Sequence, residues 1–187
     1  MKSKISTKTL TLAAILTALV VILQLVSNVT GAFLVVTITL TLVPVVIGAA
    51  KCNPLLGGWL GFVAGVTILL SGAATTFFVF SPIGTVTTVL IKGTASGVAA
   101  GYMYKLLERK NKTVAIFTAA AVAPIVNTGI FFVGCLIFFM PLISEWAGGA
   151  NVAVYMFTVL AGVNFLVEFA LNIILAPTAK RLIEIKN

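Results

Sequence analysis

Two charged residues of this 187-residue chain lie inside long apolar stretches, where a charge is costly to keep. Lys92 falls within residues 84–107, and Glu168 falls within residues 153–178. A charge at the centre of a membrane-spanning helix costs at least about 2.5–3.5 kcal/mol on insertion scales, so such a residue normally faces a cavity or a partner. A buried ammonium group can act as the counter-ion of a ligand carboxylate. The two residues are therefore our first candidates for a ligand site.

Amide side chains accompany both charges. Asn164, Glu168 and Asn172 recur every four residues, which places them on one face of a helix. Asn127 lies in another apolar stretch, at a depth similar to that of Glu168. These positions predict that three helices bring an ammonium, amides and a carboxylate together around a polar ligand. The substrate-binding residues predicted from this pattern are Lys92, Asn127, Asn164 and Glu168.

A direct ion pair between Lys92 and Glu168 is the alternative interpretation, in which the amides merely form hydrogen bonds between helices. Counting residues from the same membrane surface places the two charges about 8 Å apart along the helix axis, which disfavours a direct contact. Such a pair would leave no ammonium group for a ligand carboxylate. Both interpretations stay open at the level of the sequence.

Residue types that activate water or bind catalytic metals are scarce. The chain contains no His, and its four acidic residues are all Glu, of which only Glu168 lies well inside an apolar stretch. Intramembrane proteases and metal-dependent transferases need His, Asp or paired carboxylates, so we predict no enzyme activity and no metal site. Cys52 and Cys135 lack CxxC spacing and are predicted to be packing residues.

The elements that must position these residues are membrane helices. The chain is 60% hydrophobic and 9% charged, with a mean hydropathy of +1.21, a balance that water-soluble domains do not have. A helix needs roughly 20 apolar residues to cross a bilayer. We therefore predict an all-α membrane protein that forms one substrate-binding domain over residues 1–187, with a loop at 73–83. Its six expected spans, in one compact bundle, are residues 8–27, 33–50, 54–72, 84–107, 113–140 and 153–178.

Basic residues mark one side of this predicted bundle. If the N-terminus is cytoplasmic, six crossings place Lys51, the cluster 105–112 and the tail 180–186 in the cytoplasm, while the outer loops carry no basic residue. Five crossings would strand one of these groups outside. We therefore predict a multi-pass protein of the cell membrane with both termini in the cytoplasm. Because the basic residues that produce the net charge of +8 flank apolar spans, nucleic acid is not expected as a partner.

Small and aromatic residues indicate surfaces for packing and docking. Ala14 and Ala18 form a smooth face on the first span. Phe80, in the connection before the fourth span, is our candidate for a lid over the ligand site. Two glycine series with four-residue spacing are expected to let two helices pack closely within the protein. They are Gly57, Gly61 and Gly65, and Gly93, Gly97 and Gly101.

Several motifs follow one another along the chain: Ala14-x-x-x-Ala18, Ser81-Pro82-Ile83-Gly84 leading into Leu90-Ile91-Lys92-Gly93, and Asn164…Glu168…Asn172 before Ala176-Pro177. Their order resembles a known family, the substrate-binding S components of energy-coupling factor (ECF) vitamin transporters. The resemblance covers nearly the whole chain. It implies that the chain binds a vitamin at its extracellular end and docks through Ala14 and Ala18 on a transmembrane coupling subunit, which two ATPases drive. It implies no cofactor in this chain, because the partner subunits use the ATP, and the chain has no G-x-x-x-x-G-K-[ST] motif.

The segments Pro124-Ile125-Val126-Asn127-Thr128-Gly129 and Gly134-Cys135 look most like the pantothenate branch of that family. A cationic Lys92 near amides suits a small ligand with a carboxylate and with hydroxyl or amide groups, and pantothenate has all three. Biotin and folate also carry a carboxylate, whereas riboflavin, thiamine and pyridoxine do not, and these vitamins are the alternatives. A self-sufficient transporter or channel for a small solute and a purely structural membrane subunit are the other classes that we consider.

Overall fold

The computed structural model describes residues 7–33, 40–160 and 162–184, and the regular structure within these ranges is entirely helical. The all-α prediction is therefore confirmed for the described part of the chain. The elements in chain order are α1 (Thr7–Phe33), α2 (Leu42–Lys51), α3 (Pro54–Leu70), α4 (Thr75–Phe80), α5 (Pro82–Leu107), α6 (Lys112–Gly134), the π-helix η1 (Cys135–Phe139), α7 (Met140–Ala147), α8 (Val152–Tyr155), the π-helix η2 (Met156–Leu160) and α9 (Gly162–Glu184).

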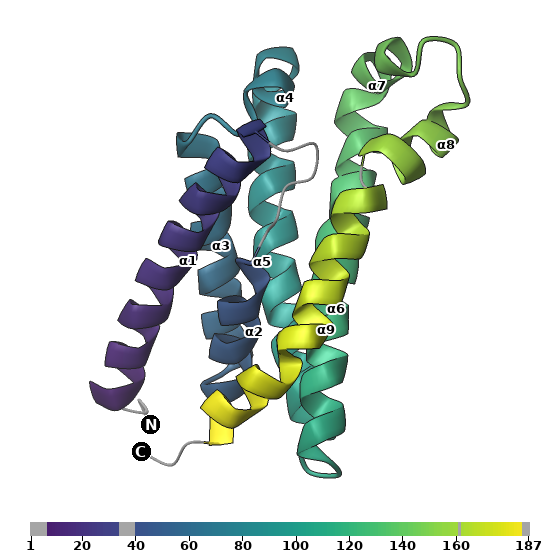
Figure 1. Ribbon diagram of the computed structural model, residues 1–187. Coiled ribbons are helices and arrows are strands. Elements are labelled where there is room, and N and C mark those ends of the chain that lie inside the picture. The colour runs from purple at the N-terminus through teal and green to yellow at the C-terminus, as the bar shows by residue number, and fades with distance from the viewer. Residues whose placement is uncertain (1–6, 34–39, 161, 185–187) are drawn as a thin grey trace.

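The long helices run alongside one another, and α1 begins at the same end of the molecule at which α9 finishes (Figure 1). Hydrogen bonds join the elements at this end. Lys51 donates from Nζ to the carbonyl oxygen of Leu182 at 2.9 Å, and Lys180 donates from Nζ to Oγ1 of Thr113 at 2.7 Å. We call this end the basic end; it carries Lys51, Lys105, Arg109, Lys110, Lys112, Lys180 and Arg181. The short helices α4 and α7 lie at the opposite end (Figure 1).

The helices differ in whether they are long enough to cross a bilayer. Three helical segments are long and apolar enough to cross, namely Thr7–Val29, Pro82–Leu107 and Lys112–Phe138. The pair Val152–Leu160 and Asn164–Glu184, bent by 43°, makes a fourth if it is counted as one span. The remaining apolar helices are α2, with 10 residues, and α3, with 17. Residues 34–39 of the expected second span lie outside the described residues, and the count of six spans stays a prediction.

Glycine residues bring α3 and α5 into backbone contact, as the four-residue spacing predicts. A Cβ atom built on Gly57 would lie 2.6 Å from the carbonyl oxygen of Gly97, so no side chain fits there. Gly61 and Gly93 oppose each other in the same way. This confirms that the glycine faces pack inside the protein, and close backbone approach through small residues is a common way for membrane helices to associate.

The segment 73–83, expected to be a loop, instead contains the helix α4, and that expectation was wrong. The physical reason is tertiary packing by one aromatic side chain. The ring centroid of Phe77 lies 5.0 Å from that of Phe139, 5.6 Å from that of Trp146 and 5.8 Å from that of Phe131. Edge-to-face pairs at such distances add stability beyond the burial of apolar area. The helical turn holds Phe77 in this position, and the sequence pattern alone does not reveal it.

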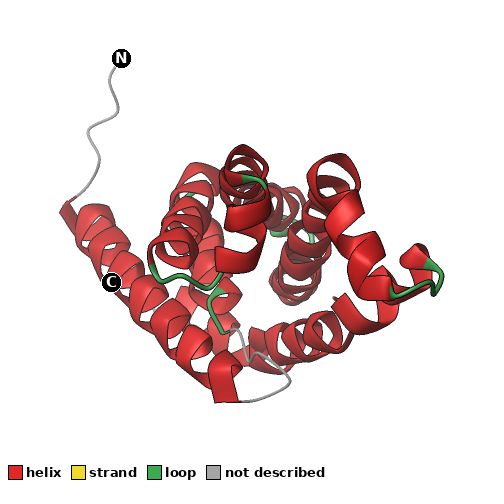
Figure 2. Cartoon of the chain, turned by 90° about the horizontal axis from the view of Figure 1, so that it is seen from above, coloured by secondary structure: helices red, strands yellow, loops and turns green. Residues whose placement is uncertain are grey.

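The core has two parts. The larger cluster includes Leu16, Val20, Leu60 and Ile116 and lies among α1, α2, α3, α5 and α6. The smaller cluster forms near the end that carries α4 and α7, around Phe139 and neighbouring apolar residues. Seen from above, α1 lies along one edge of the group of helices (Figure 2). Between the two clusters the helices enclose a polar cavity.

Candidate ligand-binding site

A cavity of about 240 Å³ opens between the two core clusters. Seven elements contribute to its wall, so the cavity brings together residues that are far apart in the sequence. The lining residues are Gln24 of α1; Thr41 and Leu42 at the start of α2; Gly61, Ala64, Gly65 and Ile68 of α3; Val89, Lys92 and Gly93 of α5; Asn127, Thr128 and Phe131 of α6; and Leu160, Asn164, Phe165 and Glu168 of η2 and α9.

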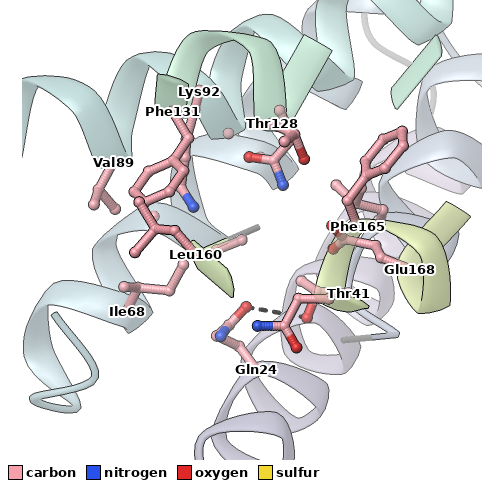
Figure 3. Close-up of a pocket in the computed structure, with 17 residues that line it drawn as sticks. Gln24, Thr41, Ile68, Val89, Lys92, Thr128, Phe131, Leu160, Phe165 and Glu168 are labelled. Carbon is pink, nitrogen blue, oxygen red and sulfur yellow. Dashed lines mark hydrogen bonds between the residues drawn. The ribbon is translucent and has the colours of Figure 1, made fainter. Parts of the chain in front are cut away.

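Lys92 supplies the positive charge of the cavity. Its ammonium nitrogen lies 5.3 Å from the centroid of the Phe131 ring, within the range of a cation–π interaction. Glu168 lies on the opposite side of the open space (Figure 3). Within the described part of the chain no ion pair joins these two residues, and the ion pair that is formed there, Lys180 with Glu184 at 3.9 Å, lies at the basic end. The geometry thus disfavours the interpretation in which Lys92 and Glu168 simply neutralise each other.

The amides of the predicted site have different surroundings. Asn127 lines the cavity, and its buried Oδ1 atom has no hydrogen-bond partner. Asn164 also lines the cavity, one helical turn from Glu168. Asn172 does not line it, because its Nδ2 donates to the carbonyl oxygen of Glu168 at 2.8 Å and its side chain is buried against the helix. Of the three polar residues on this face of α9, Asn164 and Glu168 therefore line the cavity and Asn172 does not.

Sequence reasoning missed Gln24 and Thr41, which form another wall. Both are buried, and Thr41 donates from Oγ1 to Oε1 of Gln24 at 3.1 Å (Figure 3). The amide nitrogen of Gln24 donates in turn to Oδ1 of Asn28 at 3.0 Å. Gln24 follows the buried Leu16 and Val20 at spacings of four, so it continues the inward face of α1. That spacing is the signal that could have identified it.

Phe80 and the two alanines lie away from the cavity. Phe80 ends α4 with 44% of its surface exposed and is not among the lining residues, whereas Phe131 and Phe165 are. Ala14 and Ala18 are exposed on α1, on a face other than that of the buried Leu16 and Val20. The structure therefore brings four of the predicted substrate-binding residues together around one cavity and leaves Phe80 outside it.

Comparison with curated proteins and with solved structures finds no match to this chain. The family model described as "ECF transporter, substrate-specific component" matches residues 8–179, which is nearly the whole sequence. Proteins of this kind are integral membrane subunits that bind a transported substrate and work with a membrane-embedded energy-coupling module; they are not enzymes. The chain belongs to the family of substrate-specific components of ECF transporters.

Proposed function

We propose that this protein captures a small water-soluble vitamin that carries a carboxylate, with pantothenate as the best candidate. The observation that supports this proposal most directly is the ammonium group of Lys92, which faces a polar cavity and forms no ion pair with Glu168 in the described part of the chain. A carboxylate entering the cavity would give this ammonium group a counter-ion in direct contact, through a charge-assisted hydrogen bond. The substrate-binding residues in this proposal are Lys92, Asn127, Asn164 and Glu168.

Cavity size supports a small ligand. The volume of about 240 Å³ is below the range of about 300–1,000 Å³ that is typical of pockets for drug-sized ligands. Folate and riboflavin are considerably larger than pantothenate, and riboflavin, thiamine and pyridoxine offer Lys92 no carboxylate. Biotin, which is small and carries a carboxylate, is the strongest alternative vitamin. Phe80 keeps at most a role near the entrance, because it does not line the cavity.

We further propose that the basic end faces the cytoplasm and that the whole chain is one membrane domain of six crossings. Basic residues are retained on the cytoplasmic side of membrane proteins, and the hydrogen bonds of Lys51 and Lys180 gather the basic residues of α2, α6 and α9 at one end. The ligand would then enter from the extracellular end, which carries α4 and α7. A coupling subunit and two ATPases would complete the transporter, so that ATP is used outside this chain.

A calorimetric titration of the purified chain tests the proposal. We expect saturable binding of pantothenate and at least 100-fold weaker binding of thiamine, riboflavin and pyridoxine, because the last three leave Lys92 without a carboxylate partner. Biotin and folate complete the panel as carboxylate-bearing competitors. Saturable binding of a vitamin without a carboxylate, or of none of the six by protein that retains its helical circular-dichroism spectrum, would overturn the proposal.

Docking on the coupling subunit is a separate prediction, and it concerns the exposed face of α1. Replacing Ala14 or Ala18 by Trp is expected to abolish co-purification with the coupling subunit and vitamin uptake, because a large ring prevents close approach of a partner helix. Calorimetric affinity for the vitamin should stay within about twofold, since neither alanine lines the cavity. The matched control is Ile174→Trp, at an exposed apolar position of α9, which should leave co-purification unchanged. Loss of vitamin binding in the alanine variants would contradict this assignment.

A further inference from the structure

The cavity has a donor side and an acceptor side. Lys92 provides three N–H donors and a positive charge on α5. Across the open space, Glu168 provides a carboxylate on α9 that forms no ion pair within the described residues (Figure 3). Asn127 of α6 adds a buried carbonyl oxygen, Oδ1, without a hydrogen-bond partner. One wall therefore offers donors, and two other helices offer acceptors, of which the Asn127 oxygen has no partner and the Glu168 carboxylate forms no ion pair within the described residues.

The buried Oδ1 atom of Asn127, which has no hydrogen-bond partner, indicates what kind of ligand group must approach it. Buried polar atoms in folded proteins are almost always hydrogen-bonded, and an exception calls for a functional explanation. An ionised carboxylate can only accept hydrogen bonds, and the same holds for a side-chain carbonyl oxygen. The ligand group that fits this side of the cavity is thus a hydrogen-bond donor, such as a hydroxyl or an ammonium group. A second ligand carboxylate would be repelled by Glu168.

We propose that the ligand binds in one orientation, with its carboxylate at Lys92 and a hydroxyl donor at the Glu168 carboxylate and Asn127 Oδ1, and that Glu168 selects for this donor. The inference rests on the proposed function and goes beyond it by assigning each end of the ligand to a named wall. Pantothenate has a carboxylate at one end and two hydroxyls near the other, separated by an amide. A ligand analogue that lacks a hydrogen-bond donor binds far more weakly to a site that accepts hydrogen bonds. The loss is larger than when an apolar pocket binds an analogue that lacks one methylene group.

The experiment pairs changes in the ligand with changes in the protein. The ligands are pantothenate, its alcohol analogue pantothenol, in which the carboxylate is replaced by a hydroxymethyl group, and a dideoxy analogue that lacks both hydroxyls. The proteins are the wild type, Lys92→Met and Glu168→Gln, with dissociation constants measured by calorimetry. Glu145→Gln is the matched control, because it makes the same chemical change at an exposed position of α7, far along the chain from the cavity lining.

We expect each substitution to weaken only those ligands that carry the group contacted by the replaced side chain. Glu168→Gln should weaken pantothenate and pantothenol by roughly 10- to 100-fold and leave the dideoxy analogue within about threefold. Lys92→Met should weaken pantothenate and the dideoxy analogue by roughly 100-fold or more and leave pantothenol within about threefold. Glu145→Gln should change none of the three. Should Glu168→Gln fail to fold, Asn127→Leu, which removes the second acceptor, is expected to give the same ligand pattern as Glu168→Gln.

Three outcomes would overturn this inference. If Glu168→Gln weakened the binding of all three ligands equally, Glu168 would have a structural role and would not contact the ligand. If it weakened only the ligands that carry a carboxylate, the ligand would bind in the opposite orientation. Binding that requires Na⁺ in the wild type and loses this requirement in Glu168→Gln would assign the acceptors to a cation. In each of these cases the wild type still binds pantothenate, so the proposed function survives. Failure of the folded wild type to bind all three ligands would instead overturn the proposed function and the inference with it.

Discussion

Replacing Lys92 by Met is expected to weaken pantothenate binding by roughly 100-fold or more, as measured by calorimetric titration of the purified protein. The physical reason is that truncating one partner of a buried, hydrogen-bonded charge pair costs about 2–5 kcal/mol, much of it from the charge left without a partner. Met keeps the length and most of the apolar surface of the Lys stem that passes Phe131. The change therefore removes the charge and leaves the volume nearly intact.

The same α5 helix offers a control for this prediction. Lys105→Met makes an identical substitution at an exposed position near the basic end, and it should leave the affinity unchanged. The competing interpretation, a structural pair of Lys92 with Glu168, predicts a different pattern. In that case each neutral replacement lowers the melting temperature and the double replacement with Glu168→Gln partly recovers it. Such recovery, together with unchanged vitamin affinity in Lys92→Met, would contradict our assignment.

Replacing Gly57 by Ala is expected to lower the melting temperature of the detergent-purified protein by roughly 5 °C or more. The added methyl group would lie 2.6 Å from the carbonyl oxygen of Gly97 and 2.5 Å from Cβ of Ala49, so α3 must move away from its neighbours. Overpacking of this kind costs about 1–3 kcal/mol, occasionally more, because well-packed interiors have little room to yield.

Gly129 provides the matched control within α6. A Cβ atom built there meets nothing within 4 Å, so packing does not require glycine at this position. Gly129→Ala should leave the melting temperature unchanged or raise it slightly, since Ala is favoured over Gly in a helix by about 0.5–1 kcal/mol. Thermal unfolding followed by circular dichroism compares the two variants directly. Equal melting temperatures would contradict the close contact between α3 and α5.

The helices could be located from the sequence because apolar runs of the required length are a strong signal. The expected spans at 84–107 and 113–140 agree closely with α5 and with Lys112–Phe138. Shorter elements could not be located in this way. Helix α4 depends on contacts of Phe77 with rings from distant segments. The sequence has no Pro near the 43° bend between Val152–Leu160 and Asn164–Glu184, so the bend could not be predicted from it.

Among the residues that line the cavity, only those with charged or amide side chains could be predicted from the sequence. Lys92, Asn127, Asn164 and Glu168 attract attention because a polar group in an apolar stretch is costly, and all four line one cavity. Gln24 gives a weaker signal because it is uncharged and lies near the end of a span. Phe80 was chosen from its position in the sequence, but the direction in which an aromatic side chain points depends on the three-dimensional fold, and Phe131 and Phe165 line the cavity instead.

The backbone contact between α3 and α5 also has a consequence for motion. A Cβ atom added to Gly57, Gly61, Gly93 or Gly97 would overlap the backbone of the opposing helix, so the two backbones are closely packed and we expect α3 and α5 to move as one unit. Two of these glycines, Gly61 and Gly93, belong to the cavity wall. We therefore expect any motion that opens the cavity to involve the walls formed by the other helices, and not the contact between α3 and α5. The α3–α5 pair would then be the fixed wall of the cavity while a substrate enters and leaves.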